Sequence, residues 1–172
     1  MSVRRLTPRR VVITGVENAG KSTLVRHLSD ALGWPSVPEA ARSETAVKEG
    51  RTTPGDLQRL LDGFRSALNV QRDTLFDTGP IVLDLWAKTV WDHPLQGVEA
   101  AQHDVDLFLL CDTLPEWEPD PLRSLPRLED RQALEARYVK ALERSGRPWA
   151  RLPVAPVAER VEWARQAIAQ HA

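Results

Sequence analysis

One stretch near the N-terminus constrains the fold of this 172-residue chain more than any other. Three apolar β-branched residues, 11–13, come before a G-x-x-x-x-G-K-S sequence at residues 15–22, and an apolar helical pattern begins at Leu24. A tight loop between a strand and a helix points several backbone N–H groups at an anion, at the positive end of the helix dipole. Residues 15–22, the phosphate loop, are therefore predicted to bind the phosphates of a nucleotide.

Each residue type in the phosphate loop suits one part of a nucleotide. The glycines permit the backbone shape, and Lys21 is expected to reach between the β- and γ-phosphates. Ser22 is expected to offer its hydroxyl to Mg²⁺. We therefore expect ATP with Mg²⁺ to be bound through Gly15, Glu17, Asn18, Ala19, Gly20, Lys21, Ser22 and Thr23.

The remainder of the chain alternates strand and helix patterns. Thr53 and Pro54 are a typical helix start, and apolar residues then recur at helical spacing to residue 68. Asp56, Gln58 and Arg59 lie off that apolar face and are expected to face solvent. The five short strands interleaved with helices favour an α/β fold with a parallel, doubly wound sheet, in one domain spanning residues 1–172.

Charged residues follow two of the predicted strands. Glu39 and Arg42 come after a short strand at 36–37, and Asp77 ends the strand at 74–76. Ligands of parallel sheets bind beyond the carboxyl ends of the strands. Glu39 and Arg42 are therefore candidate substrate contacts, although an acidic and a basic residue in a loop are also typical of solvated surface. Asp77 is a candidate for holding Mg²⁺ or for accepting the proton of an attacking hydroxyl, although Asp-Thr-Gly-Pro is also good turn chemistry.

Six tryptophans accompany a single tyrosine. Trp86 and Trp91 follow the Asp77 turn, and we expect them to line a substrate pocket, where their rings can stack on a flat heterocycle. The lone Cys111, in an apolar strand, is expected to be a core residue. Packing in the core is the expectation for the other tryptophans, which are Trp34, Trp117, Trp149 and Trp163.

Residues 114–131, called here the lid segment, differ in composition from the segments before them. The segment carries four prolines among many charged residues, so it is too polar and too broken to be core. In a phosphoryl-transfer enzyme such a segment can be a mobile lid whose arginines close on the triphosphate. The alternative is a solvated surface loop.

The charge balance argues against polymeric anions as partners. The chain has 23 basic and 24 acidic residues, which provides no general attraction for nucleic acid or for an anionic membrane. The arginines within residues 1–10 are interpreted as a solvated leader, and no long apolar run follows them. We therefore expect a cytoplasmic protein with a small-molecule substrate, and the sequence leaves its oligomeric state open.

A resemblance to a known family rests on six segments in order: 15–24 (GVENAGKSTL), 38–42 (PEAAR), 76–78 (FDT), 106–110 (DLFLL), 120–123 (DPLR) and 129–131 (EDR). In these the chain resembles P-loop small-molecule kinases, in particular the ribosylnicotinamide (nicotinamide riboside) kinase domain and related AAA-type small ATPase-fold proteins. The resemblance extends over essentially the full length.

The resemblance implies a three-layer P-loop NTPase fold with strand order 2-3-1-4-5 and a lid, and transfer of the γ-phosphoryl group of ATP to a ribose hydroxyl. It further implies that Glu39 or Asp77 orients and deprotonates that hydroxyl and that Arg42 contacts substrate or phosphate. Arg123 and Arg131 are implied as lid arginines.

Three functions remain open at this stage. The first is a kinase with nicotinamide riboside as the leading acceptor, in NAD biosynthesis. The second is a nucleoside or nucleotide kinase. The third is a regulatory module that binds ATP with little phosphoryl transfer. A GTPase switch is disfavoured because the chain lacks an Asn-Lys-x-Asp guanine signature.

Overall fold

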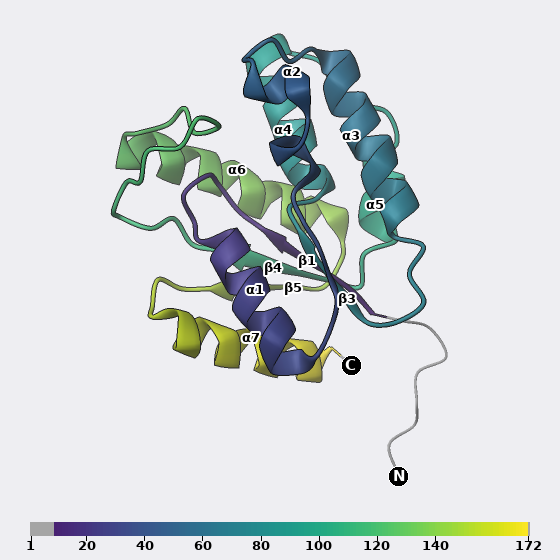
Figure 1. Ribbon diagram of the computed structural model, residues 1–172, viewed down its shortest axis with the longest axis vertical. Helices are drawn as coiled ribbons and strands as arrows, with labels where there is room; N and C mark the ends of the chain where they lie inside the picture. The colour runs from purple at the N-terminus through teal and green to yellow at the C-terminus, as the bar shows by residue number, and fades with distance from the viewer. Residues whose placement is uncertain (1–8, 172) are drawn as a thin grey trace.

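A five-stranded parallel sheet forms the centre of the protein, whose computed structural model describes residues 9–171. The strand order is β2-β3-β1-β4-β5 (Figure 1), which confirms the predicted fold and order. Neighbouring strands are parallel throughout. Their bounds are β1 Arg10–Thr14, β2 Ser36–Val37, β3 Thr74–Asp77, β4 Leu107–Cys111 and β5 Trp149–Leu152.

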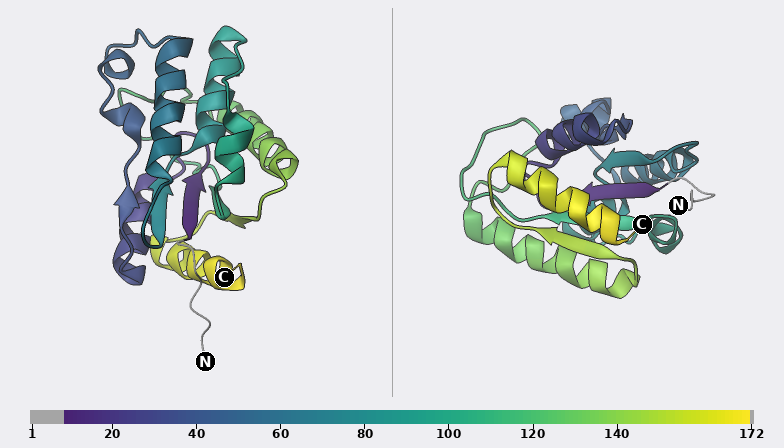
Figure 2. Two further views of the ribbon diagram at one scale, coloured as in Figure 1. Left: turned by 90° about the vertical axis from the view of Figure 1, so that its right-hand side faces the viewer. Right: turned by 90° about the horizontal axis from the view of Figure 1, so that it is seen from below.

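Helices cover both faces of this sheet, as Figure 2 shows from two further sides. Helices α1 (Lys21–Leu32) and α7 (Val157–Gln170) pack together on one face. On the other face, α6 (Leu128–Ser145) packs against α4 (Pro80–Trp91) and α5 (Val98–His103). The remaining helical elements are η1 Ala40–Arg42, α2 Thr45–Lys48 and α3 Pro54–Ala67. The three layers are those expected.

Helix α3 begins where its sequence indicates. The Thr53 hydroxyl accepts a hydrogen bond from the Asp56 N–H, and the Asp56 carboxylate accepts one from the Thr53 N–H at 2.7 Å. This reciprocal pair is a capping box. The prediction that Asp56 faces solvent is wrong, because the cap buries the carboxylate, which is 8% exposed. The hydrogen bonds from the Thr53 side chain and backbone also lower the pKa of Asp56.

Two apolar cores hold the layers together. The main core lies between the sheet and its covering helices, and Cys111 is buried in it as predicted. Burial raises the pKa of the Cys111 thiol to about 11. The second core lies between α3, α4 and α5. Three tryptophans pack partly buried against the main core, which confirms the prediction for Trp34, Trp149 and Trp163.

The interpretation of residues 1–10 as a leader falls mostly on residues 1–8, which lie outside the described residues. Of the rest, Arg9 forms an ion pair with Asp73 at 2.8 Å, and Arg10 forms one with Asp106 at 3.1 Å. These two arginines therefore lie at the amino ends of the strands, in ion pairs, and are not part of a solvated leader. Between residues 9 and 171, no helix has the length and apolar character needed to cross a bilayer.

Candidate active site

The carboxyl edge of the sheet brings the sequence-predicted residues together. Asp77 is paired in register with Ile13 of β1, and the Thr78 N–H donates to the Ile13 carbonyl at 3.0 Å. Asp77 therefore lies at the strand end beside the one from which the phosphate loop starts. This arrangement follows from the β1–β3 pairing, which places two segments far apart in sequence side by side.

The phosphate loop has the backbone shape that its glycines allow. Gly15 has φ 139°, and a Cβ there would lie 2.7 Å from the Cys111 carbonyl oxygen. Gly20, with φ 73°, caps α1. The Lys21 ammonium donates to the Val16 carbonyl at 2.7 Å, which holds the lysine over its own loop. The loop and its lysine are thus arranged for an anion at the start of α1.

A cavity of about 240 Å³ lies over this loop and is called here the loop cavity. Its walls join the phosphate loop to residues from other segments of the chain. Its lining residues are Glu17, Asn18, Ala19, Gly20, Lys21, Ser22, Thr23, Glu39, Arg42, Leu122 and Arg123. The structure therefore gathers the expected ATP-contacting loop, the Glu39–Arg42 turn and one lid arginine around one space.

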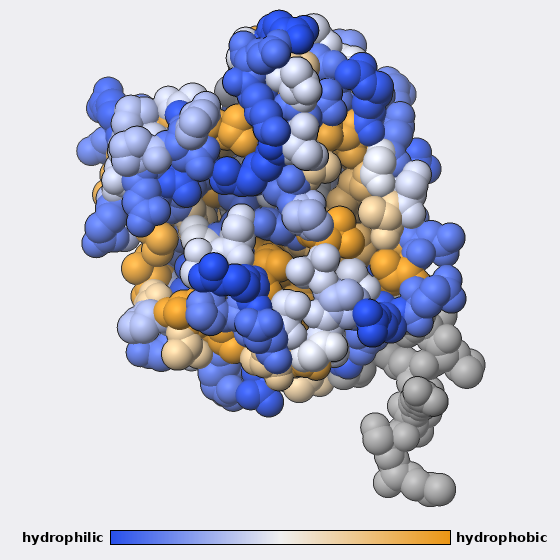
Figure 3. Space-filling model, viewed as in Figure 1, coloured by the Kyte–Doolittle hydropathy of each residue, from blue (hydrophilic) through white to orange (hydrophobic). Residues whose placement is uncertain are grey.

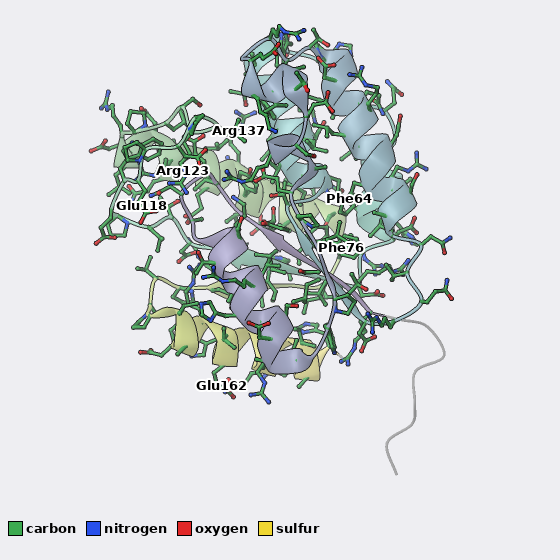
Figure 4. The ribbon with its side chains drawn as sticks, viewed as in Figure 1. Phe64, Phe76, Glu118, Arg123, Arg137 and Glu162 are labelled. Carbon is green, nitrogen blue, oxygen red and sulfur yellow. The ribbon has the colours of Figure 1, made fainter. Side chains whose placement is uncertain are left out.

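A second cavity, of about 80 Å³, opens between β3, α3 and the turn after β2, and is called the apolar cavity. Most of its lining is apolar, including the Phe64 and Phe76 rings, which meet edge to face at 5.6 Å (Figure 4). Among the described residues, its charged lining groups are Glu39 and Asp77. Glu39 lines both cavities.

The two carboxylates differ in their surroundings. Asp77 is 7% exposed, and its Oδ1 has no hydrogen-bond partner among residues 9–171. Glu39 accepts from the Arg42 Nε at 3.1 Å, and the same guanidinium donates to Asp120 in the lid segment at 3.1 Å. The Leu122 N–H and, to a smaller extent, Arg42 lower the pKa of Asp120. Arg42 thus links the turn after β2 to the lid segment.

The lid segment is docked on the phosphate loop through two loop side chains. Asn18 donates to the Glu116 carbonyl, and its Oδ1 accepts from the Glu118 N–H at 3.2 Å and from Arg123 at 2.9 Å. Glu17 accepts from the backbone N–H groups of residues 124, at 2.8 Å, and 125. Figure 4 shows Arg123 and Glu118 close together in the lid segment. Glu17 and Asn18 therefore fasten the lid segment as well as lining the loop cavity.

Arg131 occupies a different position from Arg123. It lies in the first turn of α6, is 0% exposed and lines neither the loop cavity nor the apolar cavity. Its guanidinium donates to the carbonyls of residues 114, 115, 125 and 126 and stacks over Trp117 at 5.1 Å. In this arrangement Arg131 ties both ends of the lid segment to α6, and its expected contact with phosphate stays a prediction.

The tryptophans after the Asp77 turn also lie away from these spaces. The residues that line the two cavities, all within 9–171, do not include Trp86 or Trp91. Their rings lie 6.4 Å apart and pack partly buried against the second core. Phe64 and Phe76 provide the aromatic surface of the apolar cavity instead. Phe64 lies on the apolar face of α3 and gave no sequence signal that separates it from a core residue.

Arg160, on α7, is a further residue of the site that sequence reasoning missed. It is 4% exposed and donates to the Ala19 carbonyl of the phosphate loop at 3.0 Å. A signal was present, because Arg160 is spaced three residues after Val157 and four before Ala164, on the face predicted to be apolar. A charged residue on such a face calls for a buried partner.

Comparison with known proteins agrees with this geometry. A family model described as "AAA domain" matches residues 10–160. The chain belongs to this family. No curated protein matches the chain in sequence. The match to this AAA domain family covers the phosphate loop, both cavities and Arg160.

Solved structures with this fold include several small-molecule kinases. A NadR protein in complex with NR superposes with a TM-score of 0.73 at 21% identity, covering 95% of this chain and 51% of that one. A deoxyadenosine kinase from M. mycoides gives 0.64 at 15% identity, covering 94% and 98%. A sugar kinase from Janibacter sp. HTCC2649 gives 0.65 at 17% identity, covering 95% of each. The chain therefore has the P-loop kinase fold, and it spans about half of the NadR protein.

Proposed function

We propose that the protein is an ATP-dependent kinase that transfers the γ-phosphoryl group to a hydroxyl of a small nucleoside-like acceptor, with nicotinamide riboside as the leading acceptor. The observation that carries this proposal is the position of Glu39, which lines both the loop cavity and the apolar cavity. A donor phosphate in the first and an acceptor in the second meet at this carboxylate. Phosphoryl transfer depends mainly on such positioning and on charge neutralisation.

The loop cavity supplies the donor half. The backbone N–H groups of the phosphate loop and the Lys21 ammonium bind the phosphates, and Arg123 reaches them from the lid segment when it leaves Asn18. Mg²⁺ fits the residues present, because Ser22 lies in the first turn of α1 and the buried Asp77 Oδ1 lacks a partner in the described chain. When bound, Mg²⁺ neutralises charge on the phosphates.

The apolar cavity supplies the acceptor half. We assign proton acceptance from the attacking hydroxyl to Glu39, because it lies where the two cavities meet, and the Mg²⁺ contact to Asp77. Arg42 orients Glu39 through the 3.1 Å hydrogen bond and connects it to the lid segment. Closing of that segment over the donor is thereby linked to the position of the base.

The charge of the apolar cavity favours a nucleoside over a nucleotide as acceptor. The charged groups lining it in the described chain are two carboxylates, which repel the phosphate of a nucleoside monophosphate. A neutral riboside, or the cationic ring of nicotinamide riboside, is compatible with them. The aromatic edges of Phe64 and Phe76 offer such a ring an apolar surface.

The test is an acceptor panel with Mg-ATP. Nicotinamide riboside, adenosine, cytidine and the corresponding monophosphates are incubated with the protein, and ADP release and product mass are measured. We expect turnover with a riboside and none with the monophosphates. Tight ATP binding without acceptor-dependent turnover would contradict the kinase proposal and support a regulatory ATP-binding module.

A further inference from the structure

Arg160 is a buried charge that forms no ion pair with any other residue in the described part of the chain. Its side chain is 4% exposed, and its Nη1 donates to the Ala19 carbonyl at 3.0 Å. Its Nε and Nη2 are buried without a hydrogen-bond partner, and none of the ion pairs formed within residues 9–171 includes it. A charge removed from water without full compensation is costly. The burial of Arg160 at this cost indicates that its charge has a functional role.

The guanidinium lies directly against the phosphate loop. A Cβ on Gly20 would come within 3.1 Å of the Arg160 Nη1, so this glycine leaves room for the arginine as well as adopting φ 73°. Gly20 caps α1, the helix whose N-terminus faces the expected phosphates. Helix α1 packs closely against α7 (Figure 1), and Arg160 lies in the first turn of α7, next to Ala19 and Gly20.

The positive charge acts on the same buried region as Lys21. The pKa of the Cys111 thiol is raised by burial, and the charges of Arg160 and Lys21 are the largest influences opposing this rise. Cys111 ends β4 next to the phosphate loop, where its carbonyl lies against Gly15. Arg160, on α7, and Lys21, in the phosphate loop, therefore both contribute positive potential at the end of β4.

We propose that Arg160 is a positioning residue for the nucleotide phosphates. It holds the Ala19 carbonyl outward, which keeps the neighbouring N–H groups directed into the loop cavity, and its unpaired charge is balanced when the triphosphate binds. This proposal rests on the ATP-binding part of the proposed function and extends it to a residue on α7. Its consequence is that the charge destabilises the nucleotide-free protein and is offset in the ATP complex.

The test compares Arg160→Met, Arg160→Lys and the control Arg165→Met, whose side chain is on the same helix and 51% exposed. Thermal unfolding is measured alone and with Mg-ATP, and affinities for Mg-ATP and adenosine are measured by calorimetry. For Arg160→Met we expect an unchanged or higher Tm without nucleotide. We also expect a loss of about tenfold in Mg-ATP affinity, with adenosine affinity unchanged. Arg160→Lys should recover part of the loss, and Arg165→Met should behave as wild type.

Two outcomes would overturn the role of Arg160. One is a fall of several degrees in the Tm of nucleotide-free Arg160→Met with unchanged Mg-ATP affinity in both variants, which is the behaviour of a structural residue. The other is an equal loss of adenosine and Mg-ATP affinity. If Arg160→Met does not fold, Mg-ATP affinity of Arg160→Lys equal to that of wild type overturns it. A wild-type protein that binds Mg-ATP but phosphorylates no acceptor contradicts only the kinase proposal, whereas one that does not bind Mg-ATP contradicts both.

Discussion

The donor and acceptor halves of the candidate site are built in different ways. The loop cavity is formed mostly by one continuous stretch, residues 17–23, whose shape is set by backbone dihedrals and local hydrogen bonds. The apolar cavity is assembled from the turn after β2, from α3 and from the end of β3. Phosphate is recognised by backbone groups, which any sequence with suitable glycines presents. In the site proposed here the acceptor would be recognised by side chains, so its identity could change while the donor stays the same.

The two halves are also held in place by different kinds of contact. In Figure 3 the face that carries α1 is mainly hydrophilic over the lid segment and α2, and apolar residues reach the surface in smaller patches between them. The lid segment is held by polar contacts from Glu17 and Asn18. The acceptor side is held by the second core, against which Phe64 also packs. Four predictions, which use five variants, test this contrast.

The largest effect is expected from Lys21→Ala in the donor half. Removing the ammonium takes away a charge that stabilises the transferred group, and kcat should fall by about 10³-fold. Steady-state ADP release measures it. The exposed Lys140→Ala is the control and should retain wild-type kcat. Loss of activity in both would show that the assay reports general loss of folded protein.

Glu39→Gln and Asp77→Asn test the assignment of the two carboxylates. Loss of a general base should lower kcat by about 10²-fold in Glu39→Gln, with little change in the Mg²⁺ concentration needed for half-maximal rate. Asp77→Asn should raise that Mg²⁺ concentration. Rates measured against Mg²⁺ concentration separate the two. If Glu39→Gln instead changed the Mg²⁺ requirement and Asp77→Asn did not, Asp77 would be the base and Glu39 the Mg²⁺ contact.

Glu17→Ala tests how the lid segment is fastened. The variant removes the carboxylate that accepts from the backbone N–H groups of residues 124 and 125, and each such bond to a charged group contributes about 1.5 to 3 kcal/mol. Amide hydrogen exchange at these two residues should accelerate at least tenfold. Exchange in β1 is the internal reference and should not change. Unaltered exchange at 124 and 125 would mean that the segment is held elsewhere.

The smallest effects are expected from Gly63→Ala, which should stabilise the fold but weaken acceptor binding. Gly63 is in α3 and lines the apolar cavity, and a Cβ there meets nothing within 4 Å. Alanine should raise the Tm by about 2 °C through helix propensity. The added methyl should raise the acceptor KM about threefold by filling the cavity. Gly55→Ala, in the same helix but outside the cavity, should change only the Tm. An unchanged acceptor KM in Gly63→Ala would place the acceptor elsewhere.

Residues that depend on local rules were predictable from the sequence. The start of α3 at Thr53 follows from residues within one helical turn, and the backbone of the phosphate loop follows from eight contiguous residues that include Gly15 and Gly20. Asp77 was placed correctly at the end of β3 for the same reason. Asp56 was misplaced, because its helical face was considered without its bond to Thr53.

Other residues could not be placed without the tertiary structure. Arg131 shares the composition of the lid segment, yet the chain folds back so that four carbonyls surround its guanidinium. Trp86 and Trp91 follow Asp77 in sequence, but the packing of α4 against its neighbouring helices turns them toward the second core. Phe64, which precedes Asp77 in the sequence and lies on α3, lines the apolar cavity instead.

The sequence alone was enough to predict the conformation of the phosphate loop, because such a loop is specified by contiguous backbone geometry and by the strand and helix on either side of it. The tertiary structure alone decided that Glu39 joins two cavities, that Arg42 connects it to the lid segment, and that Arg160 lies against the loop. These are contacts between segments distant in sequence, and only the pairing of strands and the packing of helices determine which of them meet.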